Sequence, residues 1–134
     1  MPDIRIKDAA VILGVSDDTV RRWIDSGGLE SHKDDTGRKV IAGDVLAQFA
    51  RENAAPPPDP LGVGSSARNR FVGLVTKVTA DRVMCEVQMQ CGPFTVVSLM
   101  STESAQQLGL EPGVIAVAVV KATTVIVETP GGAS

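Results

Sequence analysis

The chain changes character across the stretch Ala54-Ala55-Pro56-Pro57-Pro58-Asp59-Pro60-Leu61-Gly62-Val63-Gly64. Because proline fixes φ and lacks a backbone N–H, this stretch can form neither a helix interior nor a central strand. We expect an extended, semi-rigid linker that reaches up to roughly 30 Å, at about 3.1 Å per residue. Apolar residues follow a helical period before the stretch and mostly alternate, as in strands, after it. The sequence thus predicts an α+β protein with domains at residues 1–53 and 65–130 and a linker at residues 54–64; a long loop within one domain is the alternative.

N-terminal to the linker, the pattern predicts two helices joined by a tight turn. The first covers residues 7–13 and ends at Gly14, the residue type that most readily adopts the left-handed conformation of a helix end. Ser16 is a good N-cap for the second helix, at residues 17–25. The second helix has one apolar face at the spacing i, i+3, i+4, formed by Val20, Trp23 and Ile24. Helix, glycine-containing turn and helix together are the plan of a helix-turn-helix.

A helix-turn-helix places the N-terminal residues of its second helix near base edges in the major groove of DNA. The DNA-contacting residues predicted on this helix are Ser16, Asp17, Thr19, Arg21 and Arg22. Residues 29–41 then form two short extended runs around a turn at residues 35–37, as in the wing of a winged helix. Basic residues in the wing are placed to contact phosphate, namely Lys33, Arg38 and Lys39. A third helix is expected at residues 44–52, with Val45, Leu46 and Phe49 facing inward.

Over residues 4–52 the pattern AA-x-x-LGVS-x-x-TVRRW resembles the winged helix-turn-helix of the MerR and excisionase families. The resemblance implies binding to double-stranded DNA through the residues named above. The acidic pair Asp17 and Asp18 departs from many relatives, which carry neutral or basic groups there, and two carboxylates repel phosphate. Two alternatives stay open: Arg21 and Arg22 only face solvent, or this domain binds a protein instead of DNA.

The second domain is predicted to be a small β-barrel of the oligonucleotide/oligosaccharide-binding type, with five strands. The expected strands lie at residues 71–79, 83–91, 94–100, 114–120 and 124–127, and a short helix lies at residues 102–108. In the second strand the residues predicted to share one face are Val83, Cys85, Val87, Met89 and Cys91. Both cysteines are therefore interpreted as core residues and not as metal ligands or a disulfide.

Three polar segments of this domain place small hydroxyls beside a cation or a helix N-terminus. They lie at residues 65–70, 101–104 and 121–124. Hydroxyl and backbone N–H groups give directed hydrogen bonds to a tetrahedral oxyanion, while arginine, lysine and a helix N-terminus offset its charge. The only histidine of the chain, His32, lies in the other domain, so no pairing of a nucleophile with a histidine base is present and an enzyme is disfavoured.

The three segments resemble motifs of the molbindin (Mop or TOBE) family. Residues 66–73 are similar to its opening SARN-x-F-x-G, residues 103–113 to its ESA-x-x-LGL-x-x-G, and residues 121–127 to its closing KA-S/T-x-V strand. The family binds molybdate or tungstate between subunits. Carried over by resemblance, the implied ligands are Ser66, Arg68, Ser101, Ser104, Lys121, Ala122 through its backbone, and Thr123. The chain holds one such domain, and relatives with one copy assemble as dimers or hexamers, so a homo-oligomer is expected.

Composition limits the class of partner. The net charge is −3, and acidic residues also outnumber basic ones within residues 1–53, so a general polyanion binder is disfavoured. DNA binding would then rest on well-placed cations, doubled in a dimer. No apolar run reaches about 18 residues and no signal-like run opens the chain, which predicts a cytoplasmic protein without a membrane segment.

The leading hypothesis is a molybdate-responsive transcriptional regulator. In the first alternative, the protein stores or buffers molybdate and the helix-turn-helix is an accessory module. In the second, the protein binds DNA constitutively and the β-domain only oligomerises.

Overall fold

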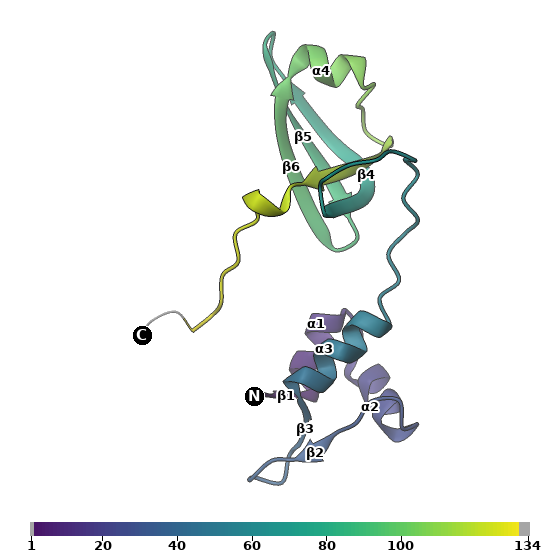
Figure 1. The fold of residues 1–134 in the computed structure, drawn as a ribbon, viewed down its shortest axis with the longest axis vertical. Helices are drawn as coiled ribbons and strands as arrows, with labels where there is room; N and C mark the ends of the chain where they lie inside the picture. Colours follow the sequence, from purple (N-terminus) through teal and green to yellow (C-terminus); the bar gives the residue numbers. More distant parts are fainter. Residues whose placement is uncertain (1, 132–134) are drawn as a thin grey trace. The chain divides into compact units, whose positions relative to one another are not determined.

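The computed structural model of the chain describes residues 2–131; Met1, which the sequence assigns to the first domain, lies outside the described residues. The chain divides into two compact units, Met1–Ala55 and Pro56–Ser134. Figure 1 shows that the first unit is mainly helical and that the second is built on a β-sheet. Residues 54–68, which include the predicted linker, form no helix or strand.

The first unit contains the three predicted helices, each within one residue of its expected start. Its elements in chain order are β1 (Asp3–Arg5), α1 (Ile6–Leu13), α2 (Asp17–Asp25), β2 (His32–Lys33), β3 (Lys39–Ala42) and α3 (Gly43–Glu52). Gly14 ends α1 with a φ of 70°, in the left-handed region. The Ser16 hydroxyl accepts the N–H of Thr19 at 3.2 Å and so caps α2. Local sequence signals therefore define both sides of the turn between α1 and α2.

The helices and the small sheet of this unit share one apolar core. Trp23 of α2 and Phe49 of α3 pack with their ring centroids 5.0 Å apart and their planes tilted by 50°. The buried core residues are Ile6, Ala9, Ala10, Val20, Leu29, Ile41 and Leu46. The core holds α2 in a fixed orientation within this unit, with its polar residues left outside.

The strand β1 is not expected from the sequence. It pairs antiparallel with β3 in the register Ile4↔Ile41, which makes a three-stranded sheet of order β1-β3-β2. Its three residues are too few to show alternation, and they become a strand only because β3 lies beside them.

The second unit is a curled antiparallel sheet with one helix (Figure 1). Its elements in chain order are β4 (Asn69–Ala80), β5 (Met84–Cys91), β6 (Phe94–Ser101), α4 (Thr102–Gln107), β7 (Ile115–Val120) and a 3-10 turn (Ala122–Thr124). The strand order is β6-β5-β4-β7. The buried core residues are Val75, Cys85, Val87, Met89, Cys91 and Ala105.

β4 is one of the two inner strands; its first half pairs with β7 and its second half with β5. The backbones come very close at Gly73, where an added Cβ would overlap the carbonyl oxygen of Gln90 and lie 2.6 Å from Sγ of Cys91. A register shift between Val75 and Lys77 follows at once. Such a shift bends and twists a strand, so this part of β4 is where the sheet curls.

The predicted fifth strand is wrong, and the described part of the unit is a four-stranded sheet and not a five-stranded barrel. After β7 the chain turns, because the backbone N–H and the hydroxyl of Thr124 both donate to the Lys121 carbonyl oxygen, at 3.0 Å and 2.8 Å. Val125, Ile126 and Val127 then run on without a strand partner, and Ile126 is 84% exposed. Strand-like composition alone does not make a strand when no neighbouring edge is available.

Val83 was also predicted wrongly, as a member of the buried face of the second strand. The carboxylate of Asp81 accepts the N–H groups of Val83 and Met84 at 2.7 Å and 2.8 Å, which holds Val83 in the turn before β5. Val83 is therefore 66% exposed, whereas the buried residues of that face are Cys85, Val87, Met89 and Cys91. The side-chain hydrogen bonds of an aspartate override the alternation at this position.

Candidate functional site

Two of the three polar segments of the second unit leave the sheet at the same end. Asn69, the first residue of β4, pairs with Val120, the last residue of β7. The side-chain amide of Asn69 also donates to the Val120 carbonyl oxygen at 3.1 Å. Because the two strands are antiparallel, the segment before Asn69 and the turn after Val120 emerge together.

These two segments carry five of the predicted ligand residues. All five are exposed, namely Ser66, Arg68, Lys121, Ala122 and Thr123. Among residues 2–131, no carboxylate forms an ion pair with Arg68 or Lys121. Two unpaired cations beside hydroxyl and backbone groups form a suitable environment for a small, doubly charged oxyanion.

The third segment lies elsewhere in the fold. Ser101 is the N-cap of α4: its hydroxyl accepts the N–H of Ser104 at 3.0 Å, and the two hydroxyl oxygens are 2.8 Å apart. Ser101 pairs with Met84, which follows the far end of β4. The twelve residues of β4 separate this segment from Asn69 by up to about 36 Å along the strand, at about 3.3 Å per residue. The sheet of one chain therefore does not place Ser101 and Ser104 beside Lys121.

One ion pair near this end of the sheet was not predicted. Arg70 Nε donates to Asp59 Oδ2 at 2.7 Å, and both side chains are partly buried. Asp59 belongs to the proline-rich stretch that the sequence assigns to the linker. The spacing of Arg68 and Arg70 was the only signal in the sequence, and the pairing of Arg70 with Asp59 is visible only in the tertiary structure.

The predicted DNA-contacting residues of α2 fall into two groups. Ser16 and Thr19 are engaged with each other, since their hydroxyl oxygens lie 3.0 Å apart, and Arg22 donates to the Thr19 hydroxyl at 3.2 Å. Asp17 and Arg21 are exposed and form no side-chain hydrogen bond or ion pair within residues 2–131. The start of α2 thus presents a small hydrogen-bonded polar group beside one free arginine.

The hairpin of β2 and β3 presents the other predicted cations. Lys33 and Lys39 lie directly opposite each other in the register, and both are exposed, as is Arg38. Like charges placed opposite each other across two strands destabilise the pair. None of the three cations forms a side-chain ion pair within residues 2–131, and an external anion such as a phosphate would stabilise them together.

Asp34 organises the tip of this hairpin. Its Oδ1 accepts the backbone N–H groups of Thr36 and Arg38, at 2.9 Å and 3.0 Å, and the Thr36 hydroxyl at 2.7 Å. The Thr36 hydroxyl, followed by the Arg38 N–H, holds the pKa of Asp34 below its usual 3.8.

Replacing Asp34 by alanine should loosen the hairpin tip. The amide hydrogens of Thr36 and Arg38 lose their acceptor and should exchange faster, as NMR hydrogen exchange can measure. Because the folded pKa is lowered, the stabilisation by the carboxylate is present above pH 3.8 and is lost as the pH falls through the lowered pKa. Asp35→Ala, at the exposed neighbouring position, is the control; equal exchange in both variants would contradict this role of Asp34.

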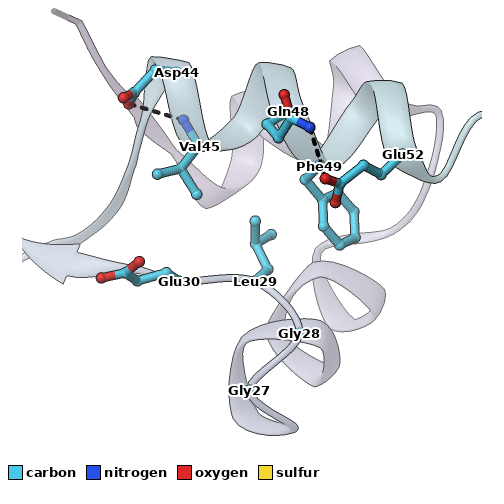
Figure 2. A pocket seen from close by; sticks show the side chains of 9 residues that line it. All are labelled: Gly27, Gly28, Leu29, Glu30, Asp44, Val45, Gln48, Phe49 and Glu52. Carbon is cyan, nitrogen blue, oxygen red and sulfur yellow. Dashed lines mark hydrogen bonds between the residues drawn. The ribbon is translucent and has the colours of Figure 1, made fainter.

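A groove of about 440 Å³ lies between α3 and the loop after α2 (Figure 2). Its floor includes Leu29 and Phe49, and its walls carry the carboxylates of Glu30, Asp44 and Glu52. The Asp44 carboxylate accepts the Val45 N–H at 2.9 Å, and Gln48 donates to Glu52 at 2.7 Å. These carboxylates repel phosphate, so the groove is unsuited to nucleic acid.

Both cysteines lie in the apolar core of the second unit. Cys85 and Cys91 are free and buried, and burial raises the pKa of the Cys91 thiol. Within residues 2–131, no three His, Cys, Asp or Glu side chains gather in a way that could hold a metal ion. Over the same residues, no helix is both long and apolar enough to cross a membrane.

Comparison with known proteins assigns each unit to a type of domain. Residues 4–54 match a helix-turn-helix domain, and residues 65–127 match the TOBE domain. No match was found among the curated proteins. The chain therefore combines a helix-turn-helix domain with a TOBE domain.

Solved structures of similar proteins match about half of the chain. A molybdate-binding protein from Sporomusa ovata is 28% identical over 50% of this chain and all of its own, with a TM-score of 0.48. MopII from Clostridium pasteurianum is 33% identical over 49% of this chain and all of its own, with a TM-score of 0.46. The cytoplasmic molybdate-binding protein ModG, in a form with molybdate bound, is 35% identical over 48% of this chain and 46% of its own, with a TM-score of 0.45. Over residues 65–127, the chain belongs to the TOBE domain family.

Proposed function

We propose that the protein is a molybdate- or tungstate-binding, DNA-binding transcriptional regulator. The oxyanion binds between TOBE domains of a homo-oligomer, and the helix-turn-helix units bind operator DNA. The observation that carries the proposal is the shared sheet end at Asn69 and Val120, where two polar segments emerge together with unpaired cations. Molybdate binding by similar proteins supports the same choice of ligand.

The proposed ligands come from two chains. One copy supplies the shared sheet end, with Ser66, Arg68, Lys121, the Ala122 backbone and Thr123, and a second copy supplies Ser101 and Ser104. The length of β4 between the two groups favours this arrangement over a site within one chain. Because two copies complete the site, the ligand stabilises the assembled state.

Assembly is also favoured by apolar surface on this unit. A groove of about 450 Å³ lies between β6 and β7, and its apolar lining includes Val97, Leu108 and Ile115. The segment of Val125, Ile126 and Val127 is exposed and lacks a strand partner within the described residues. We propose that this segment of a second copy occupies the groove, because its β-branched residues match an apolar lining and an open sheet edge.

For DNA, we propose a winged arrangement of the MerR and excisionase kind. The exposed start of α2 enters the major groove with Ser16, Asp17, Thr19, Arg21 and Arg22, and the β2–β3 hairpin contacts phosphate with Lys33, Arg38 and Lys39. The cluster of cations on the hairpin supports this orientation. A cytoplasmic location is compatible with both proposed ligands, the DNA and the oxyanion.

Arg21→Ala should weaken operator binding by about 1–3 kcal/mol if Arg21 contacts a base. A gel-shift titration with the promoter DNA of the protein's own gene measures the change. Arg51→Ala, which removes an exposed arginine from the end of α3, is the matched control. If the two variants bind the DNA with equal affinity, Arg21 does not contact the operator.

The alternative is molybdate storage or homeostasis, with the helix-turn-helix as an accessory module. Two experiments distinguish the functions. Calorimetric titration with molybdate, tungstate and sulfate tests the ligand, and absence of heat with the first two rejects oxyanion binding. A gel-shift with and without molybdate tests regulation: DNA binding that responds to molybdate supports the regulator, and no DNA binding supports storage.

A further inference from the structure

The linker is attached to the TOBE domain by one partly buried ion pair. Asp59 Oδ2 accepts from Arg70 Nε at 2.7 Å, and Asp59 Oδ1 accepts the Leu61 N–H at 2.9 Å. The Arg70 and Asp59 side chains are 23% and 32% exposed. The hydrogen bond from Arg70, followed by that from Leu61, lowers the pKa of Asp59, so the carboxylate stays charged at neutral pH.

This ion pair closes a loop that contains predicted ligands. Residues 60–69 lie between its two partners, and they include Ser66 and Arg68. Within the loop, the Ser65 hydroxyl accepts the N–H of the buried Ala67 at 3.1 Å. The loop is thus tied at both ends and at one internal point, while the Ser66 and Arg68 side chains remain exposed.

Both partners are held by stiff backbone. Pro58 and Pro60 flank Asp59 and fix the φ angles on either side of it. Arg70 lies within β4, opposite Val119 of β7, beside the shared sheet end. Since little freedom remains to be lost, the ion pair can order the loop at a low entropic cost.

We propose that Asp59 and Arg70 form a clasp that positions Ser66 and Arg68 for the oxyanion and ties the linker to the ligand-binding end of the sheet. The inference rests on the proposed function and deepens it, since it names two positioning residues for that site. With the clasp closed, the free tether between the units shortens to residues 54–58, because Asn53 is bonded to the Phe49 carbonyl oxygen at the end of α3. Its reach is about 16 Å, at about 3.1 Å per residue.

The test uses the full chain with Asp59→Asn, and Glu111→Gln as a control that removes one charge from an exposed turn of the same unit. NMR hydrogen exchange of the Leu61 and Ala67 amides measures how well the loop is ordered. Calorimetry with molybdate measures the affinity of the proposed site. In Asp59→Asn both amides should exchange faster, and molybdate affinity should fall about two- to five-fold, the range of a partly exposed ion pair. Asp59→Glu keeps the carboxylate and should restore most of the affinity.

The two readouts separate the possible failures. Unchanged exchange at Leu61 and Ala67 in Asp59→Asn would overturn the clasp itself. Faster exchange with unchanged molybdate affinity would overturn its positioning role, as would an equal loss of affinity in Glu111→Gln. If the wild-type chain gives no heat with molybdate, the proposed ligand is wrong. The proposed function and the positioning role of the clasp are then both rejected, even if hydrogen exchange shows that the ion pair orders the loop.

Discussion

Replacing Lys121 by alanine should abolish molybdate binding, with an affinity loss of at least about 100-fold, or about 2.7 kcal/mol. Lys121 is exposed, has no acidic partner within residues 2–131 and begins the turn beside the shared sheet end. Removing it leaves a bound dianion with one fewer cation in a site of only a few charges. Calorimetric titration with molybdate and tungstate measures the loss, and Arg68→Ala should behave in the same way.

The matched control is Lys77→Ala, which removes an exposed lysine from the middle of β4. It lowers the net charge equally, so a general electrostatic effect would weaken both variants alike. Far-ultraviolet circular dichroism should be unchanged in all three variants, because none of the side chains is in the core. If Lys121→Ala binds as well as Lys77→Ala does, Lys121 is not a ligand.

Gly73→Ala should destabilise the TOBE domain by about 3 kcal/mol, at the upper end of the usual cost of overpacking. The added methyl group would overlap the Gln90 carbonyl oxygen, a backbone atom, and approach Sγ of Cys91 to 2.6 Å. The two strands would have to move apart where β4 changes its partner. Since Cys85 and Cys91 are buried in this unit, denaturant-dependent reaction of their thiols measures its stability.

The chain provides two internal checks on this result. Trp23, its only tryptophan, lies in the helix-turn-helix unit, so the fluorescence transition of that unit should be unaffected. Gly64→Ala is the control, because Gly64 has open space around its Cβ position and no positive φ. Equal thiol protection in Gly73→Ala and Gly64→Ala would show that the strands are not in such close contact.

Much of the fold could be predicted because its signals are local. Gly14, the cap at Ser16 and the apolar face of α2 are decided by residues within one or two helical turns, and the helices formed where these signals indicate. The strands at β5 and β6 likewise follow from composition and alternation. The polar segments could be recognised in advance, since residue types and spacing carry their resemblance to the TOBE family.

The errors arose where particular hydrogen bonds, either to a remote strand or within a turn, decide the outcome. Asp3–Arg5 became a strand because β3 offers an edge, whereas residues 124–127 did not, because the Thr124 bonds to Lys121 turn the chain away. Val83 left the buried face because Asp81 holds it in a turn. In each case one or two hydrogen bonds outweigh a weak local preference.

The sequence by itself determined the helices of the first unit, the composition of the sheet and the set of polar groups offered to a ligand. Only the tertiary structure decided that Asn69 meets Val120, that Ser101 lies at the other end of β4 and that Asp59 pairs with Arg70. The physical reason is range: periodicity and capping act over a few residues, whereas strand register and ion pairing depend on where the chain brings remote residues together.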